Sequence, residues 1–381
     1  MCTAVALLTV TVLGAACGSE DEAAVSSATG AVGEAVESAT SEAATTEEAA
    51  TTEETTEETT ETGATDTAAA EGDLPPGVVQ FEEVEAGSGE GMKLGYISLG
   101  EAVPFARLVT NSLKEQAAKA GAELIVCDSA LDGQKALDCA RNFKTQGVQG
   151  YLNFQVDQKS SPAICSAGPD VPVIAIDIVQ PPCQDAFMGA ANEYAGELAG
   201  RALGEFIKEK FDCKYDAYVS MESTASGDAN TQRMGGYRKG FTSVCGDIQN
   251  ERILDGADRI DPARTQFTDT LTALPGKKVI VLVGINDDGL VGGLAAARTA
   301  GREGDVYMAG QGADPTAWCD IKNNPNWVGD VAYFPERYGE IGIPYLIKAV
   351  KGEEIPKDLL IPHQVVNRDN IDDIYTLEDC K

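Results

Sequence analysis

The sequence predicts an α/β fold with two doubly wound parallel-sheet lobes and a hinge and ligand cleft between them. Apolar strand segments alternate with amphipathic helical segments from residue 92 onward, which is typical of parallel sheets with right-handed crossovers. The alternation starts again after a long helical segment at 193–211, so we expect two lobes rather than one. We interpret the apolar start and the acidic stretch before the lobes as a signal peptide and a disordered linker.

The first series of elements begins with an apolar strand at 92–99. After it, six side chains share one face of a predicted helix: Phe105, Leu108, Val109, Leu113, Ala117 and Ala120. We expect further strands at 123–126, 150–153 and 171–177, with a helix at 132–146. The strand at 171–177 is apolar enough to be buried on both faces of a sheet.

The second series repeats this arrangement. Its predicted elements are strands at 216–221, 251–254, 279–283 and 305–309 and helices at 229–243, 262–273 and 288–300. Ligands of doubly wound folds bind at the carboxyl ends of the strands. This rule points to the loops that follow Leu99, Asn153, Asp177, Met221, Val283 and Ala309.

The N-terminal residues are interpreted as a targeting segment. Residues 3–16 are uncharged and mostly apolar, but a bilayer-spanning helix needs about 20 such residues, so we expect 1–16 to be a signal peptide. No basic residue precedes the apolar run, and we expect the translated start to lie upstream of Met1. The small residues before Cys17 resemble a bacterial lipobox, in which this cysteine is lipidated, although Leu13 stands four rather than three positions before it. The alternative is an ordinary signal peptide with an incidental cysteine.

Residues 17–91 are predicted to be a disordered Ala/Thr/Glu-rich tether. Residues 18–91 hold 20 acidic side chains and no basic one, and Thr-Thr-Glu-Glu occurs three times. Large apolar residues are almost absent before Leu74, so the segment cannot bury enough surface to offset the entropy of ordering. The alternative is low-complexity sequence with no role beyond solubility, which predicts the same disorder.

The charge distribution excludes several kinds of partner. The net charge is −32, and the first basic residue is Lys93. Nucleic acids and anionic lipids bind clustered Lys and Arg side chains, so we exclude both as partners of this acidic chain. The single histidine, His363, excludes histidine-based metal sites and argues against a Ser-His-Asp triad. We expect His363 to have a hydrogen-bonded structural role at a crossover.

The cysteines indicate an oxidising compartment. Eight remain after Cys2 and Cys17 are assigned to the leader and the lipid site, and no CxxC pair suggests structural zinc. An even number in an exported chain favours disulfides. The simplest pairing joins sequence neighbours: Cys127 with Cys139, Cys165 with Cys183, Cys213 with Cys245, and Cys319 with Cys380. The alternative is eight buried free thiols.

Motifs for catalysis and cofactor binding are absent or incomplete. The chain has no GxSxG, HExxH or GxxxxGK[ST] motif. Gly310 and Gly312 lack the third glycine of a dinucleotide loop, and residues 286–289 contain only a fragment of a calcium loop. We therefore expect a protein that is not an enzyme and that needs no cofactor and no metal.

Six segments in sequence order resemble the ribose-binding type of periplasmic solute-binding protein, the sugar receptors of ABC importers. They are 95–99 with Pro104 and Phe105, then 171–177, 192–200, 233–241, 285–287 and 332–335. The resemblance covers residues 92–367. It implies an N-terminal lobe of 92–191 plus 335–361 and a C-terminal lobe of 192–334 plus 362–381, which close around a ligand.

The resemblance also implies the substrate-binding residues Phe105, Asp177, Asn192, Arg233, Asn286, Gln311 and Tyr333. Carboxylates, amides and guanidinium groups hydrogen-bond sugar hydroxyls, and aromatic rings cover the apolar sugar faces. Phe105 could instead be core, Asn192 and Asn286 could cap helices, and Arg233 could hold its own helix, since the family's usual arginine aligns with Thr231.

Departures from the family pattern bear on the ligand. Ile178 stands where the family often has arginine, Gly312 where it has aspartate, and Val103 and Ala106 replace polar or aromatic residues. Fewer charged contacts indicate a ligand other than ribose, such as another sugar, a cyclitol or a sugar derivative.

The function implied by the resemblance is that of an extracytoplasmic solute-binding lipoprotein, anchored to the outer face of the cell membrane by Cys17. It would capture a sugar or sugar-like polyol and deliver it to the permease subunits of an ABC transporter, as a monomer and without catalysis. Two alternatives stay open: a ligand-presenting sensor subunit for a membrane receptor, and a surface-anchored glycosidase that uses Asp and Glu side chains.

Overall fold

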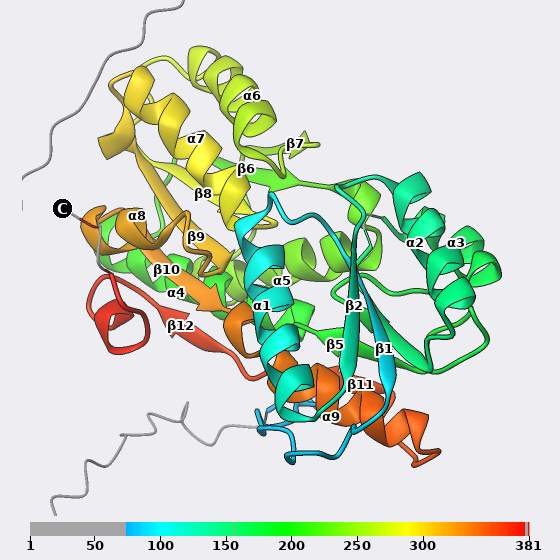
Figure 1. Ribbon diagram of the computed structural model, residues 1–381. Helices are drawn as coiled ribbons and strands as arrows, with labels where there is room; N and C mark the ends of the chain where they lie inside the picture. Colours follow the sequence, from blue (N-terminus) through cyan, green and yellow to red (C-terminus); the bar gives the residue numbers. More distant parts are fainter. Residues whose placement is uncertain (1–73, 156, 378–379, 381) are drawn as a thin grey trace, which may run out of the picture. The chain divides into compact units, whose positions relative to one another are not determined.

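The computed structural model describes residues 74–155, 157–377 and 380, and these form two lobes, each built on a six-stranded sheet (Figure 1). The predicted fold class is confirmed. The signal peptide, Cys17 and the tether up to residue 73 lie outside the described residues. No helix in the described part of the chain is long and apolar enough to cross a membrane.

The first sheet is parallel throughout, in the order β11-β5-β4-β3-β1-β2. Its strands are β1 (Lys93–Ser98), β2 (Glu123–Asp128), β3 (Gly150–Asn153), β4 (Val173–Ile176), β5 (Ala186–Gly189) and β11 (Asp358–Leu360). Helices α1 (Pro104–Lys119) and α9 (Gly339–Val350) cover one face, and α2 (Gly133–Gln146) and α3 (Ser161–Ala167) cover the other. Successive side chains of β1 pack alternately against the two helix layers, because side chains along a strand point to opposite faces of the sheet.

The second sheet has the order β12-β10-β9-β8-β6-β7, and only β12 is antiparallel. Its strands are β6 (Ala217–Glu222), β7 (Glu251–Asp255), β8 (Ile280–Gly284), β9 (Val306–Gly312), β10 (Trp327–Ala332) and β12 (Gln364–Val366). Helices α4 (Asn192–Phe211) and α5 (Asp228–Cys245) pack on one face. Helices α6 (Ile260–Thr272) and α7 (Asp287–Thr299) pack on the other, and the short α8 (Trp318–Asn323) packs beside β10.

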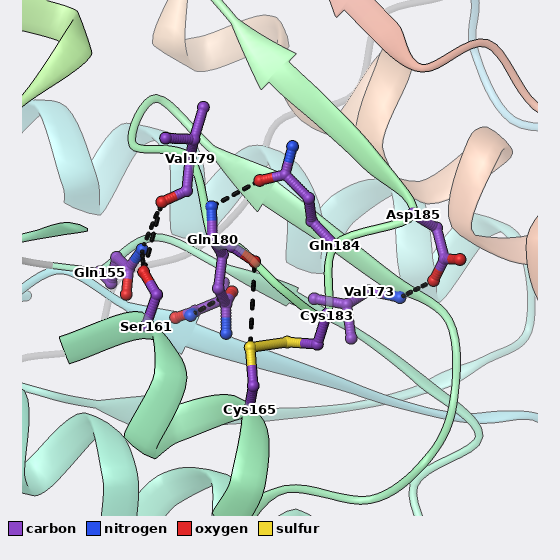
Figure 2. Close-up of a disulfide and its surroundings, with 10 residues drawn as sticks. Gln155, Ser161, Cys165, Val173, Val179, Gln180, Cys183, Gln184 and Asp185 are labelled. Atoms are coloured by element: carbon purple, nitrogen blue, oxygen red, sulfur yellow. Dashed lines mark hydrogen bonds between the residues drawn. A yellow bond between two sulfur atoms is a disulfide. The ribbon is translucent and has the colours of Figure 1, made fainter. Parts of the chain in front are cut away.

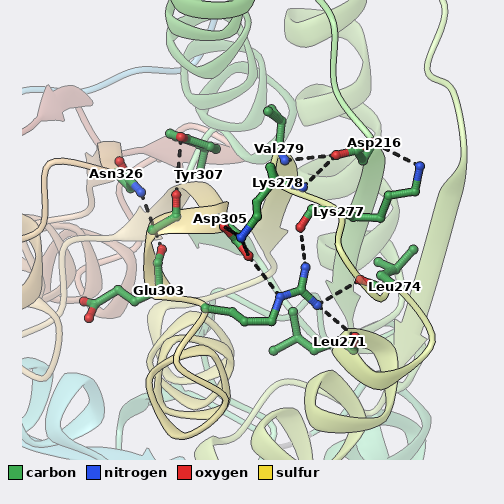
Figure 3. Close-up of polar contacts among 12 residues, drawn as sticks. Asp216, Leu271, Leu274, Lys277, Lys278, Val279, Glu303, Asp305, Tyr307 and Asn326 are labelled. Carbon is green, nitrogen blue, oxygen red and sulfur yellow. Dashed lines mark hydrogen bonds and ion pairs between the residues drawn. The ribbon is translucent and has the colours of Figure 1, made fainter.

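A polar network fixes the amino ends of β8 and β9 (Figure 3). The guanidinium of Arg302 donates to the carbonyl oxygens of Leu271 and Leu274, both at 2.9 Å, and its Nε lies 3.0 Å from Oδ2 of Asp305. Asp216 accepts from the backbone N–H groups of Lys278 and Val279 at 2.8 and 3.1 Å. These charge-assisted hydrogen bonds stabilise the amino-terminal end of the second sheet, which lies opposite to the carboxyl ends of its strands.

The prediction of a disordered tether is wrong for residues 74–91, because these residues pack on the first lobe. Gly77 and Val79 exchange backbone hydrogen bonds with Leu360 of β11, at 2.9 and 2.8 Å. Val84 is buried, and its N–H donates to Oε1 of Gln116 at 2.9 Å. Phe81 lies edge-on to Phe334 and under the guanidinium of Arg337. The low apolar content of 18–91 taken as a whole concealed these few apolar residues.

The four disulfides join sequence neighbours, as the simplest pairing predicted: Cys127–Cys139, Cys165–Cys183, Cys213–Cys245 and Cys319–Cys380. The first ties β2 to α2, and the second ties α3 to the loop after β4. The third joins the ends of α4 and α5, and the last ties the C-terminal residues to α8. Each lobe therefore carries two cross-links.

Candidate functional site

A cavity of about 280 Å³ lies between the two lobes, at the carboxyl ends of their strands. The first lobe contributes mostly apolar side chains: Leu99, Val103, Phe105, Leu131, Phe154 and Ile178, together with Asp157 and Asp177. The second lobe contributes mostly polar ones, among them Ser223, Arg233, Asp258, Asn286, Asp288, Gln311, Asp314 and Tyr333. Ligand pockets typically enclose about 300–1,000 Å³, so this cavity suits a small ligand.

Arg233 reaches into the cavity from α5. Its Nε donates to Oδ1 of Asn192 at 2.7 Å, and its Nη1 donates to the carbonyl of Ile285 at 3.2 Å. The guanidinium carbon lies 5.1 Å from the ring centroid of Tyr333, a cation–π arrangement. Two protein acceptors and an aromatic face hold the side chain in place. A guanidinium has five N–H donors, so donors remain for a ligand.

Asp177 is the acidic counterpart from the first lobe. It follows β4 with a positive φ of 56°, and a side chain at Gly189 would overlap its Oδ1. Burial raises the pKa of Asp177 to about 6, while Arg233 and a hydrogen bond from Tyr338 act in the opposite direction. Glycine at 189 is therefore required for the carboxylate to occupy this position.

Gln311 and Tyr333 form a buried pair on the second lobe. The Tyr333 hydroxyl donates to Oε1 of Gln311 at 2.6 Å, which orients the amide. Gln311 is only 1% exposed, and its Nε2 has no hydrogen-bond partner among the described residues. A buried amide nitrogen without an acceptor costs free energy, so this group is suited to an acceptor on a ligand.

Asn286 acts as a helix cap. Its Oδ1 accepts from the N–H of Gly289 at 3.0 Å, and its Nδ2 donates to the carbonyl of Asp258 at 2.9 Å. These contacts are those of a helix cap, which is one of the two roles that the sequence predicted for Asn286. Its side chain also lines the cavity. Phe105 lines the cavity too, with its ring edge-on to Phe154 and Tyr338 at centroid distances of 6.3 and 5.8 Å.

Six of the seven sequence-predicted binding residues line this cavity: Phe105, Asp177, Arg233, Asn286, Gln311 and Tyr333. The seventh, Asn192, lines a neighbouring cavity that shares Asp177 and Ala229 with this one, and its Oδ1 accepts from Nε of Arg233. Sequence reasoning missed Asp258, Ser223 and Tyr338. Asp258 follows a predicted strand, so the strand-end rule could have found it. Tyr338 carried no comparable signal.

Asp287, which lines the cavity, and Asp330, which lies behind it, form a buried acidic pair. Oδ1 of Asp330 accepts from the N–H of Ala313 at 2.9 Å, and its Oδ2 accepts from Nε1 of Trp327 at 3.1 Å. Burial raises the pKa of both carboxyl groups. Two neighbouring buried carboxylates cannot both ionise cheaply, which favours the protonated form of one member of the pair. No group of three or more His, Cys, Asp or Glu residues in the described ranges is arranged to hold a metal ion.

A disulfide joins the loop after Asp177 to the neighbouring helix α3 (Figure 2). Cys183 lies in this loop, between β4 and β5, and is bonded to Cys165 of α3. The backbone N–H of Gln180 donates to Oε1 of Gln184 at 2.5 Å, and Nε2 of Gln155 donates to the carbonyl of Val179 at 2.8 Å. The segment that carries Asp177 is thus cross-linked to the helix layer of its own lobe.

His363 connects three chain segments that pass between the lobes. Its Nε2 accepts from the N–H of Ala191 at 2.9 Å, and its Nδ1 lies 3.2 Å from the carbonyl of Ala332. These contacts require the neutral tautomer with the proton on Nδ1. Burial lowers the pKa of His363 to about 4. The expected structural role of His363 agrees with these contacts.

Comparisons with known proteins agree with this architecture. Residues 95–354 match the family described as periplasmic binding protein domain. No curated protein matches the chain. A Mycobacterium smegmatis ABC transporter solute-binding protein with bound glycerol is 23% identical, with a TM-score of 0.66 over 75% of this chain and 98% of that one.

Two further solved structures have the same fold. A Bacillus halodurans C-125 solute-binding protein with bound myo-inositol is 19% identical, with a TM-score of 0.63 over 74% of this chain and 97% of that one. An Actinobacillus succinogenes 130z protein with bound D-allose is 20% identical, with a TM-score of 0.62 over 74% of this chain and 99% of that one.

Proposed function

Because the chain belongs to the family of periplasmic binding protein domains, we propose that it is an extracytoplasmic solute-binding protein that captures a small sugar or sugar-like polyol. One observation carries the proposal: Asp177 and Arg233, from different lobes, line one small cavity together with the aromatic ring of Phe105. The bound polyols of the three structural neighbours support the same ligand class.

The chemistry of the cavity matches a polyhydroxylated ring. The carboxylate of Asp177 accepts hydrogen bonds, while the remaining N–H groups of Arg233 and Nε2 of Gln311 donate them. A hydroxyl group can satisfy either kind of partner. Phe105 supplies an apolar surface for the C–H face of a sugar ring. Asn192 orients Arg233, because its Oδ1 accepts from Nε of Arg233.

Capture would proceed by hinge closure, with no bond made or broken. We propose lobes of 92–191 plus 335–361 and of 192–334 plus 362–381, with His363 holding the crossing segments together. The ligand would be released to the permease subunits of an ABC transporter. Lipidation of Cys17 after removal of residues 1–16 would anchor a monomeric protein to the outer face of the membrane.

The test is a calorimetric and thermal-shift screen of the mature protein against pentoses, hexoses, cyclitols and glycerol. At a ligand concentration 100 times the dissociation constant, binding stabilises the folded state by about 2.7 kcal/mol. Asp177→Ala should weaken the binding of the best ligand roughly 5- to 150-fold, because a charge-assisted hydrogen bond contributes about 1–3 kcal/mol. Asp269→Ala, an exposed site on α6, is the matched control.

Other outcomes would replace the proposal. If no sugar or polyol stabilises the protein, sugar capture is wrong. Release of a hydrolysis product from a glycoside would instead establish the glycosidase alternative. Binding without stimulation of transport in vesicles that contain the permease would favour the sensor alternative.

A further inference from the structure

We propose that the ligand carries a positive charge: it is an amino-substituted sugar or cyclitol whose ammonium group lies near Asp288, between Asp258 and Asp314 of the second lobe. This inference rests on the proposed function and narrows its ligand class. It starts from the charges that line the cavity.

The cavity has more acidic than basic side chains. Six carboxyl groups line it: Asp157, Asp177, Asp258, Asp287, Asp288 and Asp314. The basic side chains that line it are Arg233 and Arg259. Arg233 faces the charge of Asp177, and Arg259 lies 3.8 Å from Asp258. The basic groups therefore offset only part of the negative charge.

Asp288 is the carboxylate with the least compensation. Its contact among the described residues is with the Thr316 hydroxyl, at 3.5 Å. Burial and the neighbouring charges of Asp314 and Asp258 together raise the pKa of Asp288 to about 6, against the lowering effect of the Thr316 hydroxyl. No ion pair to Asp288 exists in the described part of the chain. A cation placed here would relieve the repulsion among three carboxylates.

The neighbouring carboxylates are held in place by the protein. Oδ1 of Asp314 accepts from the N–H and the hydroxyl of Thr316 at 3.0 and 3.1 Å, and Arg107 attracts the same carboxylate. Oδ2 of Asp258 accepts from the hydroxyl of Ser223 at 3.0 Å. The carboxylates are thus fixed before any ligand arrives, which lowers the cost of binding.

A second feature of this wall suits a ligand. Nε2 of Gln311 is buried, has no partner among the described residues and belongs to a side chain that lines the same cavity. The amide is fixed by the Tyr333 hydroxyl, so it cannot turn to find another acceptor. It can donate to an acceptor such as a hydroxyl, which a hydroxylated amine supplies beside its ammonium group.

The opposite wall determines how the ligand is oriented. Leu99, Val103, Leu131 and Ile178 of the first lobe offer no polar side chain. An ammonium group against that wall would lose its hydration without compensation. Of the two first-lobe carboxylates in the cavity, Asp177 faces Arg233 and Asp157 accepts from the N–H and the hydroxyl of Ser160 at 2.8 and 3.2 Å. The charged end is therefore placed against the second lobe, and a carboxylate-bearing sugar such as a uronic acid is disfavoured there by like charge.

The experiment compares matched sugars on the mature protein by isothermal titration calorimetry. Each set has an amino, a hydroxyl and, where it exists, a carboxylate member on one scaffold, for example D-glucosamine, D-glucose and D-glucuronate. The galacto, manno and inositol sets complete the panel. In at least one set we expect the amino member to bind at least about tenfold more tightly than the hydroxyl member.

Isosteric variants locate the charge preference. Asp288→Asn should reduce the amino-to-hydroxyl preference to less than about threefold, while Asp269→Asn on exposed α6 should leave it unchanged. Neutral members that bind as tightly as amino members in every set would overturn the inference but leave sugar capture intact. A preference that persists in Asp288→Asn and Asp314→Asn would also overturn it. Failure of every sugar to bind would overturn the proposed function as well.

Discussion

The hydroxyl of Tyr338 donates a hydrogen bond to Oδ1 of Asp177 at 3.1 Å, although 161 residues separate them in sequence. Tyr338 lies close to the start of the segment that returns to the first lobe, immediately before α9. The contact ties the carboxylate at the end of β4 to the segment that follows the second crossing between the lobes. Asp177 is thus both a cavity residue and part of the packing near the hinge.

Asp177 should make the unliganded protein less stable as the pH rises from about 4 to 6. Burial raises its folded-state pKa from 3.8 to about 6, so the folded state binds more protons than the unfolded state in this window, and its stability falls as the pH rises. The loss is at most about 3 kcal/mol. In Asp177→Asn, urea unfolding at pH 4.5 and 6.5 should show a smaller decrease than in the wild type.

Tyr338→Phe is the companion variant. It removes the hydrogen bond that lowers the pKa of Asp177, so the decrease in stability with rising pH should become larger than in the wild type. An identical pH dependence in wild type, Asp177→Asn and Tyr338→Phe would show that this carboxylate does not titrate as described.

His363 should titrate far below the usual range for histidine. Its pKa is lowered to about 4 by burial, so the stability it contributes is complete above about pH 6.5 and is lost as the pH falls toward 4. As the only histidine in the sequence, it gives one imidazole signal in the NMR spectrum. That signal should not shift between pH 8 and 5.5, and a midpoint near 6.5 would contradict the buried neutral state.

The close packing of α4 against α5 depends on glycine. A β-carbon at Gly236 would overlap the carbonyl of Glu193, whereas one at Gly235 would meet nothing within 4 Å. Gly236→Ala should therefore destabilise the protein by about 1–3 kcal/mol through overpacking. Gly235→Ala should stabilise it by up to about 1 kcal/mol, since alanine favours the helix. Equal unfolding midpoints for the two variants would show that the helices can separate without cost.

The sequence was sufficient to predict the alternation of elements and the two lobes, because each depends on local patterns. It left the disulfide connectivity open, and the simplest pairing, between sequence neighbours, is the one that the structure has. Residues 171–177 were identified as a buried strand from their apolar composition, and β4 occupies their centre. The short β5, β11 and β12 were not predicted. Strands of three or four residues leave no periodicity to detect.

Most of the predicted binding residues line the cavity because the strand-end rule depends on topology alone. Asn192 was assigned by type and position, but its contact with Arg233 arises from the packing of α4 on α5. Such side-chain pairing across 41 residues cannot be read from either segment by itself.

The disulfide under the binding loop offers a test of positioning. Replacing Cys165 and Cys183 together by serine should increase hydrogen–deuterium exchange in the peptide 177–185, which carries Asp177, because the loop loses its tie to α3. Replacing Cys213 and Cys245, in the second lobe, is the control. Each double variant should cost about 2–4 kcal/mol of global stability. Only the first should change exchange at 177–185, and equal exchange in both would contradict a local role.

The packed residues 74–91 give the last prediction. A chain that begins at residue 92 loses the burial of Val84 and the hydrogen bonds of Gly77 and Val79 with Leu360. Burying a valine contributes about 1.5–3 kcal/mol and each hydrogen bond about 0.5–1.5 kcal/mol. The free energy of unfolding should therefore fall by about 3–5 kcal/mol in urea titrations, relative to a chain that begins at residue 74. Phe81→Ala in the longer chain should produce a smaller decrease, because it removes only the ring between Phe334 and Arg337. If the two chain lengths unfolded at the same urea concentration, residues 74–91 would contribute nothing to stability, and the predicted tether would extend to residue 91 after all.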